Sequence, residues 1–231
     1  MVVKAILMDF NGVIIDDEPI QMRAYQEILA AEGIALTEED YMSSLGMDDK
    51  TFVEAAYKRV GQTPETNKVL EITQVKTEKW REAVADRVPL FPGVENLIKK
   101  AANEFAVGIV SMAKIDEIEY VLDRTGLAEC FSVIVSAEEV DVPKPDPRCY
   151  REGFRQLDLY RIRQGHLPMI HSECVVIEDT PPGVQAGIGA DLPVLGVANT
   201  VSADELRAAG ATWIAKNLND WWPESIRRAF M

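Results

Sequence analysis

Short, almost uninterrupted apolar runs recur along the chain, and stretches with helical spacing of apolar residues separate them. The runs lie at 2–8, 105–110, 132–135, 174–177, 193–197 and, more weakly, 212–215. Runs this short, with little polar alternation, are typical of strands buried on both faces. Because helical patterns lie between most of them, we predict an α/β protein with a doubly wound parallel sheet.

The stretch 15–87 breaks this alternation, because it contains helical signals and no convincing strand. Ile20, Ala24 and Ile28 form one apolar stripe, and the segment 64–85 repeats apolar residues at helical spacing. We therefore predict two domains: an α/β core made of 1–14 and 88–231, and an inserted all-helical cap domain over 15–87. The segments around Ile15 and Arg87 are the expected hinges.

Composition narrows the possible partners and compartments. The net charge is −14, which repels polyanions, so we expect no nucleic acid partner. The sequence has no apolar run near the roughly 18 residues of a membrane helix, so no membrane partner is expected either. Three widely spaced cysteines, without metal or redox spacing, favour reduced thiols in a cytoplasmic protein. A monomer or weak dimer is the expected state.

Polar residues that suit phosphoryl transfer follow four of the predicted strands. In open α/β sheets, ligands bind beyond the carboxyl ends of the strands. The candidates there are Asp9, Ser111, Lys144, Glu178 and Asp179. Carboxylates are hard oxygen ligands, and Mg²⁺ typically takes one or two of them together with phosphate and water. We therefore predict a Mg²⁺ site that processes a small phosphorylated metabolite.

The roles follow from the residue types. Asp9 can attack phosphorus and form a phospho-aspartate. Ser111 and Lys144 can hold the equatorial phosphate oxygens, where charge spreads in the transition state. Asp179 is the better candidate for direct metal ligation, and Glu178 can act through water.

These residues resemble the four signatures of the haloacid dehalogenase superfamily, in order. The family begins with D-x-D-G-T/V, and this chain has DFNGV at 9–13. Ser111, Lys144 and the pair Glu178-Asp179 match the second, third and fourth signatures, and 15–87 resembles the small four-helix cap. The segments 111–114, 120–127, 144–147 and 178–187 resemble the beta-phosphoglucomutase-like branch. The resemblance covers essentially the whole chain and implies a phosphohydrolase.

The chain departs from the family at Asn11, where phosphatases and mutases have a second aspartate that transfers protons. An amide donates hydrogen bonds but does not exchange a proton usefully at pH 7. Its backbone carbonyl can still ligate Mg²⁺. Three interpretations stay open: a slow or substrate-restricted phosphatase with another proton donor such as Asp16, Asp17 or Glu18; a binding protein on an enzyme fold; and an engineered replacement of aspartate.

Further residues are expected near the substrate. Gly12, Ser111 and Met112 lie in the signature segments, and Lys114 can contact phosphate or the leaving group. Lys50 is the one lysine near the cap loop that reaches over the active site in relatives. A phosphatase of a sugar phosphate is the first functional hypothesis, and the alternatives are a sugar phosphate mutase and a phosphometabolite-binding protein. The stretch 157–172 is expected to form an extended loop.

Overall fold

The computed structural model describes residues 2–219 and 221–230. Within the described part, six parallel strands form one sheet in the order β3-β2-β1-β4-β5-β6. They are β1 (Ala5–Met8), β2 (Ala106–Val110), β3 (Val133–Val135), β4 (Cys174–Glu178), β5 (Val194–Val197) and β6 (Trp213–Ala215). The prediction of a parallel α/β sheet is confirmed, and all six predicted strands are present.

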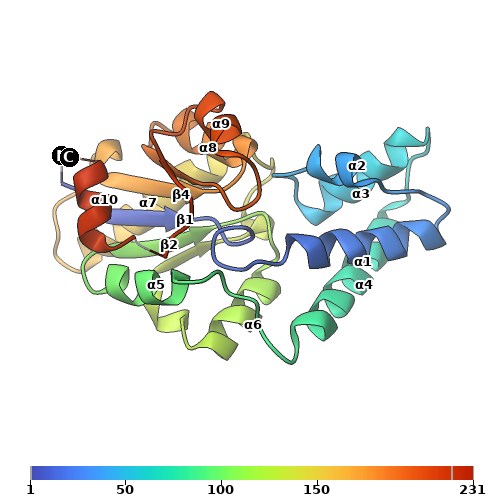
Figure 1. Ribbon diagram of the computed structural model, residues 1–231, viewed down its shortest axis with the longest axis horizontal. Coiled ribbons are helices and arrows are strands. Elements are labelled where there is room, and N and C mark those ends of the chain that lie inside the picture. The colour runs from blue at the N-terminus through green and yellow to red at the C-terminus, as the bar shows by residue number, and fades with distance from the viewer. Residues whose placement is uncertain (1, 220, 231) are drawn as a thin grey trace.

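Helices cover both faces of the sheet, because successive strand side chains point to opposite sides. One core cluster joins Ile6 and Ile109 to α5, α6 and α10, and a second joins Leu7 and Val176 to α7, α8 and α9. Their bounds are α5 (Val94–Ala102), α6 (Ile115–Thr125), α7 (Arg148–Arg163), α8 (Pro181–Gly189), α9 (Ala203–Ala208) and α10 (Pro223–Ala229). Short 3₁₀ turns lie at η1 (Ala128–Cys130), η2 (Ala137–Glu139) and η3 (His171–Glu173). The result is the expected three-layer arrangement (Figure 1).

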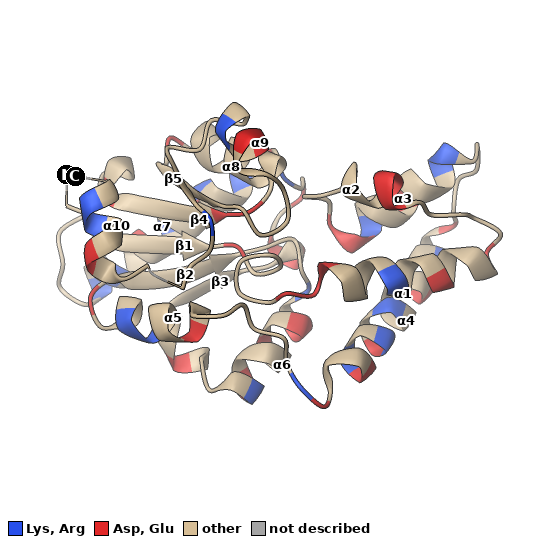
Figure 2. Ribbon diagram, viewed as in Figure 1, with Lys and Arg blue, Asp and Glu red and all other residues tan. Residues whose placement is uncertain are grey.

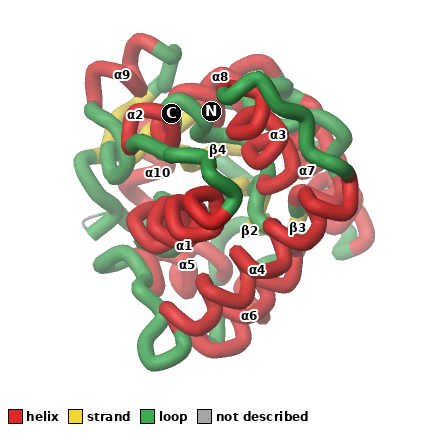
Figure 3. The backbone as a smooth tube through the Cα atoms, turned by 90° about the vertical axis from the view of Figure 1, so that its right-hand side faces the viewer, coloured by secondary structure: helices red, strands yellow, loops and turns green. Residues whose placement is uncertain are grey.

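Four helices lie between β1 and α5 and pack on one another beyond the carboxyl ends of the strands (Figure 1). They are α1 (Glu18–Ala31), α2 (Glu38–Met42), α3 (Asp49–Arg59) and α4 (Thr66–Val84), which we call the helical insert. The insert has its own apolar cluster, in which Tyr25, Leu29 and Phe52 are buried. Figure 3 is viewed from this side and shows α1 and α4 in front of the strands.

The two connections between the insert and the sheet run side by side. The Asp16 backbone N–H donates to the Pro89 carbonyl at 2.7 Å, and the Phe91 N–H donates to the Ile14 carbonyl at 3.1 Å. Ile15 pairs with Leu90 as an antiparallel bridge. The segments predicted as hinges therefore meet as a short two-stranded link.

Local signals in the sequence explain several element ends, and one expectation is wrong. Thr37 forms a capping box at the start of α2, and Gly126 ends α6 in the left-handed conformation at φ 66°. The loop expected at 157–172 is helical in its first part, because α7 continues to Arg163, and the irregular connection is limited to residues 164–170. Its stripe of buried residues, which includes Gly153 and Leu157, packs on the sheet at i, i+4 spacing. Among the described residues, no helix is both long and apolar enough to cross a bilayer.

Candidate active site

Four strand ends bring the predicted catalytic residues to one rim of the sheet, facing the helical insert. Asp9 continues β1 and its backbone N–H donates to the Ile177 carbonyl at 3.0 Å. Ser111 continues β2 and donates likewise to the Val135 carbonyl at 2.9 Å. The backbone thus fixes where these side chains begin, as the parallel sheet predicts.

Asp9 is a buried carboxylate held by two donors. Its Oδ1 accepts the Phe10 backbone N–H at 2.7 Å, and its Oδ2 lies 3.0 Å from Lys144 Nζ. Burial and the neighbouring Glu178 raise the pKa of Asp9 to about 7, although Lys144 opposes the shift. Burial also opposes the charge of Lys144, yet Asp9 and Glu178 raise the pKa of this lysine above its usual value. Lys144 is therefore a permanent cation beside Asp9.

Glu178 is fully buried and its two oxygens already have partners. Oε1 accepts from Lys144 Nζ at 2.7 Å and from the Tyr150 hydroxyl at 2.8 Å. Oε2 accepts the backbone N–H groups of Asp179 at 3.1 Å and Thr180 at 3.4 Å. Glu178 therefore orients Lys144 and the turn after β4, which favours an indirect role at a metal.

Asp179 differs from Glu178, because one of its oxygens is buried without a partner. Oδ2 accepts from the Thr200 hydroxyl, whereas Oδ1 has no hydrogen-bond donor in the described structure. Burial, then Glu178 and Asp9, raise the pKa of Asp179 well above its usual value. Gly12 packs directly against it, since a Cβ there would lie 1.8 Å from Asp179 Oδ2.

The acidic cluster fits a divalent cation. Asp9, Glu178 and Asp179 each place a carboxylate oxygen within 4.8 Å of the others. Three buried carboxylates this close repel one another, and of the three only Asp9 and Glu178 are paired with Lys144. A cation at the free Asp179 oxygen would remove the repulsion, and hard carboxylate oxygens suit Mg²⁺.

Asn11 faces a second buried carboxylate, that of Asp17. Its Nδ2 lies 3.0 Å from both Asp17 oxygens. Asp17 also accepts from Trp80 Nε1 at 2.7 Å and Gln21 Nε2 at 3.0 Å. Burial raises the pKa of Asp17 to about 6, so the group is largely ionised at pH 7. An ionised carboxylate only accepts hydrogen bonds, so the Asn11 amide points its NH₂ group toward Asp17. Its Oδ1 atom is then the one available to the pocket that Asn11 lines.

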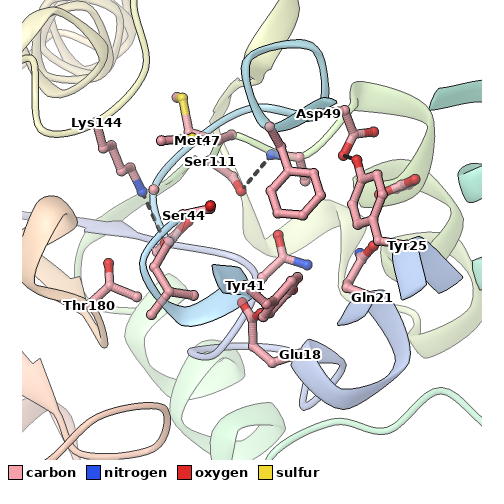
Figure 4. Close-up of a pocket in the computed structure, with 18 of the residues that line it drawn as sticks. Glu18, Gln21, Tyr25, Tyr41, Ser44, Met47, Asp49, Ser111, Lys144 and Thr180 are labelled. Atoms are coloured by element: carbon pink, nitrogen blue, oxygen red, sulfur yellow. Dashed lines mark hydrogen bonds and ion pairs between the residues drawn. The ribbon is translucent and has the colours of Figure 1, made fainter. Parts of the chain in front are cut away.

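The insert closes the pocket over Asp9. Its loop residues Ser44 and Met47 line the pocket together with Ser111, Met112 and other residues of the sheet rim. Figure 4 shows Gln21, Tyr25 and Asp49 on one side of this pocket and Lys144 and Thr180 on the other. The acidic run that leads into α1 is red in Figure 2, and from it Glu18 reaches the pocket.

The structure does not bring two predicted substrate residues to the pocket. Lys50 is exposed near the start of α3 and lies outside the pocket lining, because the cap loop approaches with residues 44–49 instead. Lys114 donates to the Thr73 carbonyl at 2.8 Å and the Thr77 hydroxyl at 3.1 Å, so it joins the core to α4. Both side chains therefore lie outside the lining of the pocket over Asp9, and their contact with substrate stays a prediction. Gly12 lies outside the lining as well, and its part is to make room for Asp179.

Sequence reasoning missed Lys76, which is 2% exposed and lines the pocket from α4. Its Nζ lies 2.9 Å from both Asp49 Oδ2 and Glu117 Oε1. Lys76 falls on the stripe that also holds Ile72 and Trp80. A lysine within an apolar helical stripe was the available signal, because a buried amine needs partners.

Comparison with known proteins places these residues in a family. The family model for haloacid dehalogenase-like hydrolase matches residues 3–191. The chain is 29% identical over 225 residues to SUPPRESSOR OF QUENCHING 1 from Arabidopsis thaliana, covering 94% of the chain but only 20% of that protein. It is 27% identical to CbbY from Rhodobacter capsulatus, covering 84% of the chain and 85% of CbbY. It is 25% identical to phosphoglycolate phosphatase from Yersinia pseudotuberculosis, with 84% and 81% covered.

The fold is also found among solved structures. The crystal structure of beta-phosphoglucomutase from Clostridium difficile superposes with a TM-score of 0.84 at 19% identity, over 99% of this chain and 97% of that one. The helical insert and the sheet therefore share an arrangement with that protein.

Proposed function

This chain belongs to the haloacid dehalogenase-like hydrolases, and from that membership we propose that it is a magnesium-dependent phosphatase of a small phosphorylated metabolite such as a sugar phosphate. One observation carries the proposal. The Asp9 carboxylate lies beside the Lys144 ammonium and within 4.8 Å of Asp179, whose Oδ1 has no partner among the described residues. The similarity to phosphoglycolate phosphatase supports the same reaction class.

Asp9 is the nucleophile of the proposed reaction. An Asp9 oxygen bonds to phosphorus while the bond from phosphorus to the leaving oxygen breaks, and water then hydrolyses the phospho-aspartate to release phosphate. Lys144 offsets the charge of Asp9 and of the incoming phosphate, and Ser111 completes the rim that holds its oxygens. The residues that would hold Mg²⁺ are Asp9, Asp179, Glu178 through water, and the Asn11 backbone carbonyl. Bound there, Mg²⁺ would supply charge that lowers the repulsion between phosphate and carboxylates.

The site lacks an acid–base side chain at position 11, where the family transfers protons. Asn11 cannot serve as an acid or base, and loss of such a group costs about 10²- to 10⁴-fold in rate. Asp16 is exposed, and Asp17 is fully buried behind Asn11, whereas Glu18 lines the pocket. Burial raises the pKa of Glu18 to about 7, and the Tyr41 hydroxyl donates to it at 2.6 Å. Glu18 is therefore the proposed proton donor to the leaving oxygen.

The helical insert is proposed to act as the cap of the enzyme, with the paired segments at Ile15 and Leu90 as hinge. Closure of such a cap excludes water until the phosphate has moved to Asp9. With a weak proton donor, substrates that leave without protonation should react best.

A phosphate-release panel tests the proposal. We expect Mg²⁺-dependent release from acyl and aryl phosphates, and release from alkyl monoesters that is slower by about tenfold or more. Asp9→Asn should abolish release, whereas Asp123→Asn, the same change on an exposed face of α6, should leave it unchanged. Activity that survives Asp9→Asn refutes the assigned nucleophile, and conversion of sugar phosphate isomers without phosphate release refutes the phosphatase.

A further inference from the structure

The side of the pocket opposite Lys144 carries several hydrogen-bond acceptors, and Figure 4 shows Gln21, Asp49 and Glu18 there. Gln21 is 7% exposed, and its Nε2 donates to Asp17 at 3.0 Å. That bond fixes the orientation of the amide, so Gln21 Oε1 is the amide atom left without a donor. Oε1 is buried and has no partner among the described residues. A buried unpaired acceptor in a binding pocket indicates a donor on the ligand.

Two carboxylates lie on the same wall as Gln21. Glu18 Oε2 accepts from the Tyr41 hydroxyl at 2.6 Å, and Asp49 Oδ1 accepts from the Tyr25 hydroxyl at 2.6 Å. Each of these groups retains lone pairs for further donors. The wall thus offers at least three acceptor groups to a ligand.

The cations of the pocket are already matched by carboxylates. Its lining holds two lysines, Lys76 and Lys144, and neither arginine nor histidine. Lys76 is paired with Asp49 and Glu117, and Lys144 with Asp9 and Glu178. Among the lining residues, four carboxylates face two lysines. A second anionic group on the substrate would therefore meet no unpaired lysine among these lining residues.

We propose that the substrate carries a single phosphate, and that its organic part is a neutral polyhydroxyl group whose hydroxyls donate to Gln21 Oε1 and to the carboxylates beside it. This inference rests on the proposed phosphatase function and names the substrate class for it. The phosphate lies at Asp9 and Lys144, and the polyol extends to the insert. A bisphosphate or a phosphorylated carboxylate is rejected by the acceptor wall.

Competition between substrates provides the kinetic test. We compare kcat/KM for a hexitol monophosphate, a hexose bisphosphate and phosphoglycolate, with acetyl phosphate as a probe that lacks hydroxyls. The kcat/KM of the hexitol monophosphate should exceed that of the bisphosphate and of phosphoglycolate by at least about tenfold, because each of these brings a second anion into a pocket whose lining lysines are already paired. Equal or higher kcat/KM for either of them overturns the proposal.

A matched pair of variants tests Gln21 itself. Gln21→Met keeps the shape of the side chain and removes the acceptor, so the ratio of kcat/KM for the hexitol monophosphate to that for acetyl phosphate should fall at least about tenfold. Gln62→Met, at an exposed position outside the pocket, should leave the ratio unchanged. An unchanged ratio in Gln21→Met contradicts the assigned contact.

Binding to Asp9→Asn separates this inference from the phosphatase proposal. Calorimetry with Mg²⁺ should show the hexitol monophosphate binding at least about tenfold tighter than the bisphosphate, even if no substrate is turned over by the unmodified chain. In that case the phosphatase proposal fails and the substrate class stands. Failure of the hexitol monophosphate to bind, or tighter binding of the bisphosphate, overturns the substrate class.

Discussion

The substitution Trp80→Phe tests whether Asp17 is held as a buried anion. Trp80 is fully buried, and its indole Nε1 donates to Asp17 Oδ2 at 2.7 Å. Phenylalanine keeps most of the apolar contact and removes the donor. Asp17 retains the donors from Asn11 and Gln21, so the variant should still fold.

The size of the effect should depend on pH. A hydrogen bond to a charged group contributes about 1.5–3 kcal/mol, and one between neutral groups about 0.5–1.5 kcal/mol. The smaller ring adds a loss of about 1 kcal/mol, which is independent of pH. We therefore expect the free energy of unfolding to fall by about 3 kcal/mol at pH 8, where Asp17 is ionised. At pH 5, where Asp17 is protonated, the loss should be nearer 2 kcal/mol.

The sign follows from the pKa of Asp17 in the two states. Its pKa is raised by burial to about 6 in the folded chain and is about 3.9 when unfolded. The folded state therefore binds the proton more tightly, and the contribution of Asp17 to stability decreases as pH rises from about 4 through 6. Losing the indole donor raises the folded pKa further, so the decrease continues to higher pH in Trp80→Phe.

Urea unfolding at pH 5 and pH 8 measures this difference. Trp213→Phe is the matched control, because Trp213 is 50% exposed and lacks a hydrogen bond to a buried carboxylate. Its loss should stay below about 0.5 kcal/mol at both pH values. Equal losses for Trp80→Phe at pH 5 and pH 8 would falsify the view that Asp17 is an anion stabilised by the indole.

Three further predictions concern the insert and the acidic cluster of Asp9, Glu178 and Asp179. Lys76→Met leaves Glu117 buried without its cation and should lower the free energy of unfolding by about 3–5 kcal/mol, with partial recovery in the double variant that adds Glu117→Gln; a neutral result in chemical denaturation contradicts the pairing. Gly12→Ala places a Cβ 1.8 Å from Asp179 Oδ2 at a φ of +73°, and thermal unfolding should show a free energy of unfolding lower by about 1–3 kcal/mol. An unchanged value would show that the turn moves to accommodate the methyl group. Mg²⁺ at about 100 times its Kd should raise the free energy of unfolding by about 2.7 kcal/mol, and Asp179→Asn should remove that gain. An equal gain in both proteins would show that the ion binds elsewhere.

The sheet and the rim of the site were predictable because both follow from local rules. Buried parallel strands read as short apolar runs, and the residues after them share one edge whatever the loops do. Asp9, Ser111 and Lys144 meet for that reason, although Lys144 arrives on a loop whose path the sequence does not specify. The packing of Gly12 against Asp179 was not predicted, because it joins two strand ends that are far apart in the sequence.

The substrate side of the pocket was harder, because it depends on how the insert sits on the sheet. Lys50 and Lys76 both occur in the insert, and sequence proximity to the cap loop favoured Lys50. In the structure Lys76 lines the pocket instead, because it belongs to the face of α4 that packs on the core through Glu117. The ligand contact proposed for Gln21 could not be predicted from sequence, because it depends on one bond to Asp17 that sets the orientation of the amide.

The Asn11–Asp17 pair also explains why an aspartate at position 11 should not by itself restore a proton carrier. Two carboxylates about 3 Å apart in a buried site cannot both be ionised, so Asn11→Asp would share one proton with Asp17. We therefore expect a small gain in alkyl phosphate hydrolysis from Asn11→Asp alone, and a larger gain, toward about 10²-fold, when Asp17→Asn returns an amide donor to the pair. Rates at saturating substrate for both variants, with Asp17→Asn alone as reference, separate the two cases. If the single change already gives the full gain, Asp17 does not govern the charge at position 11.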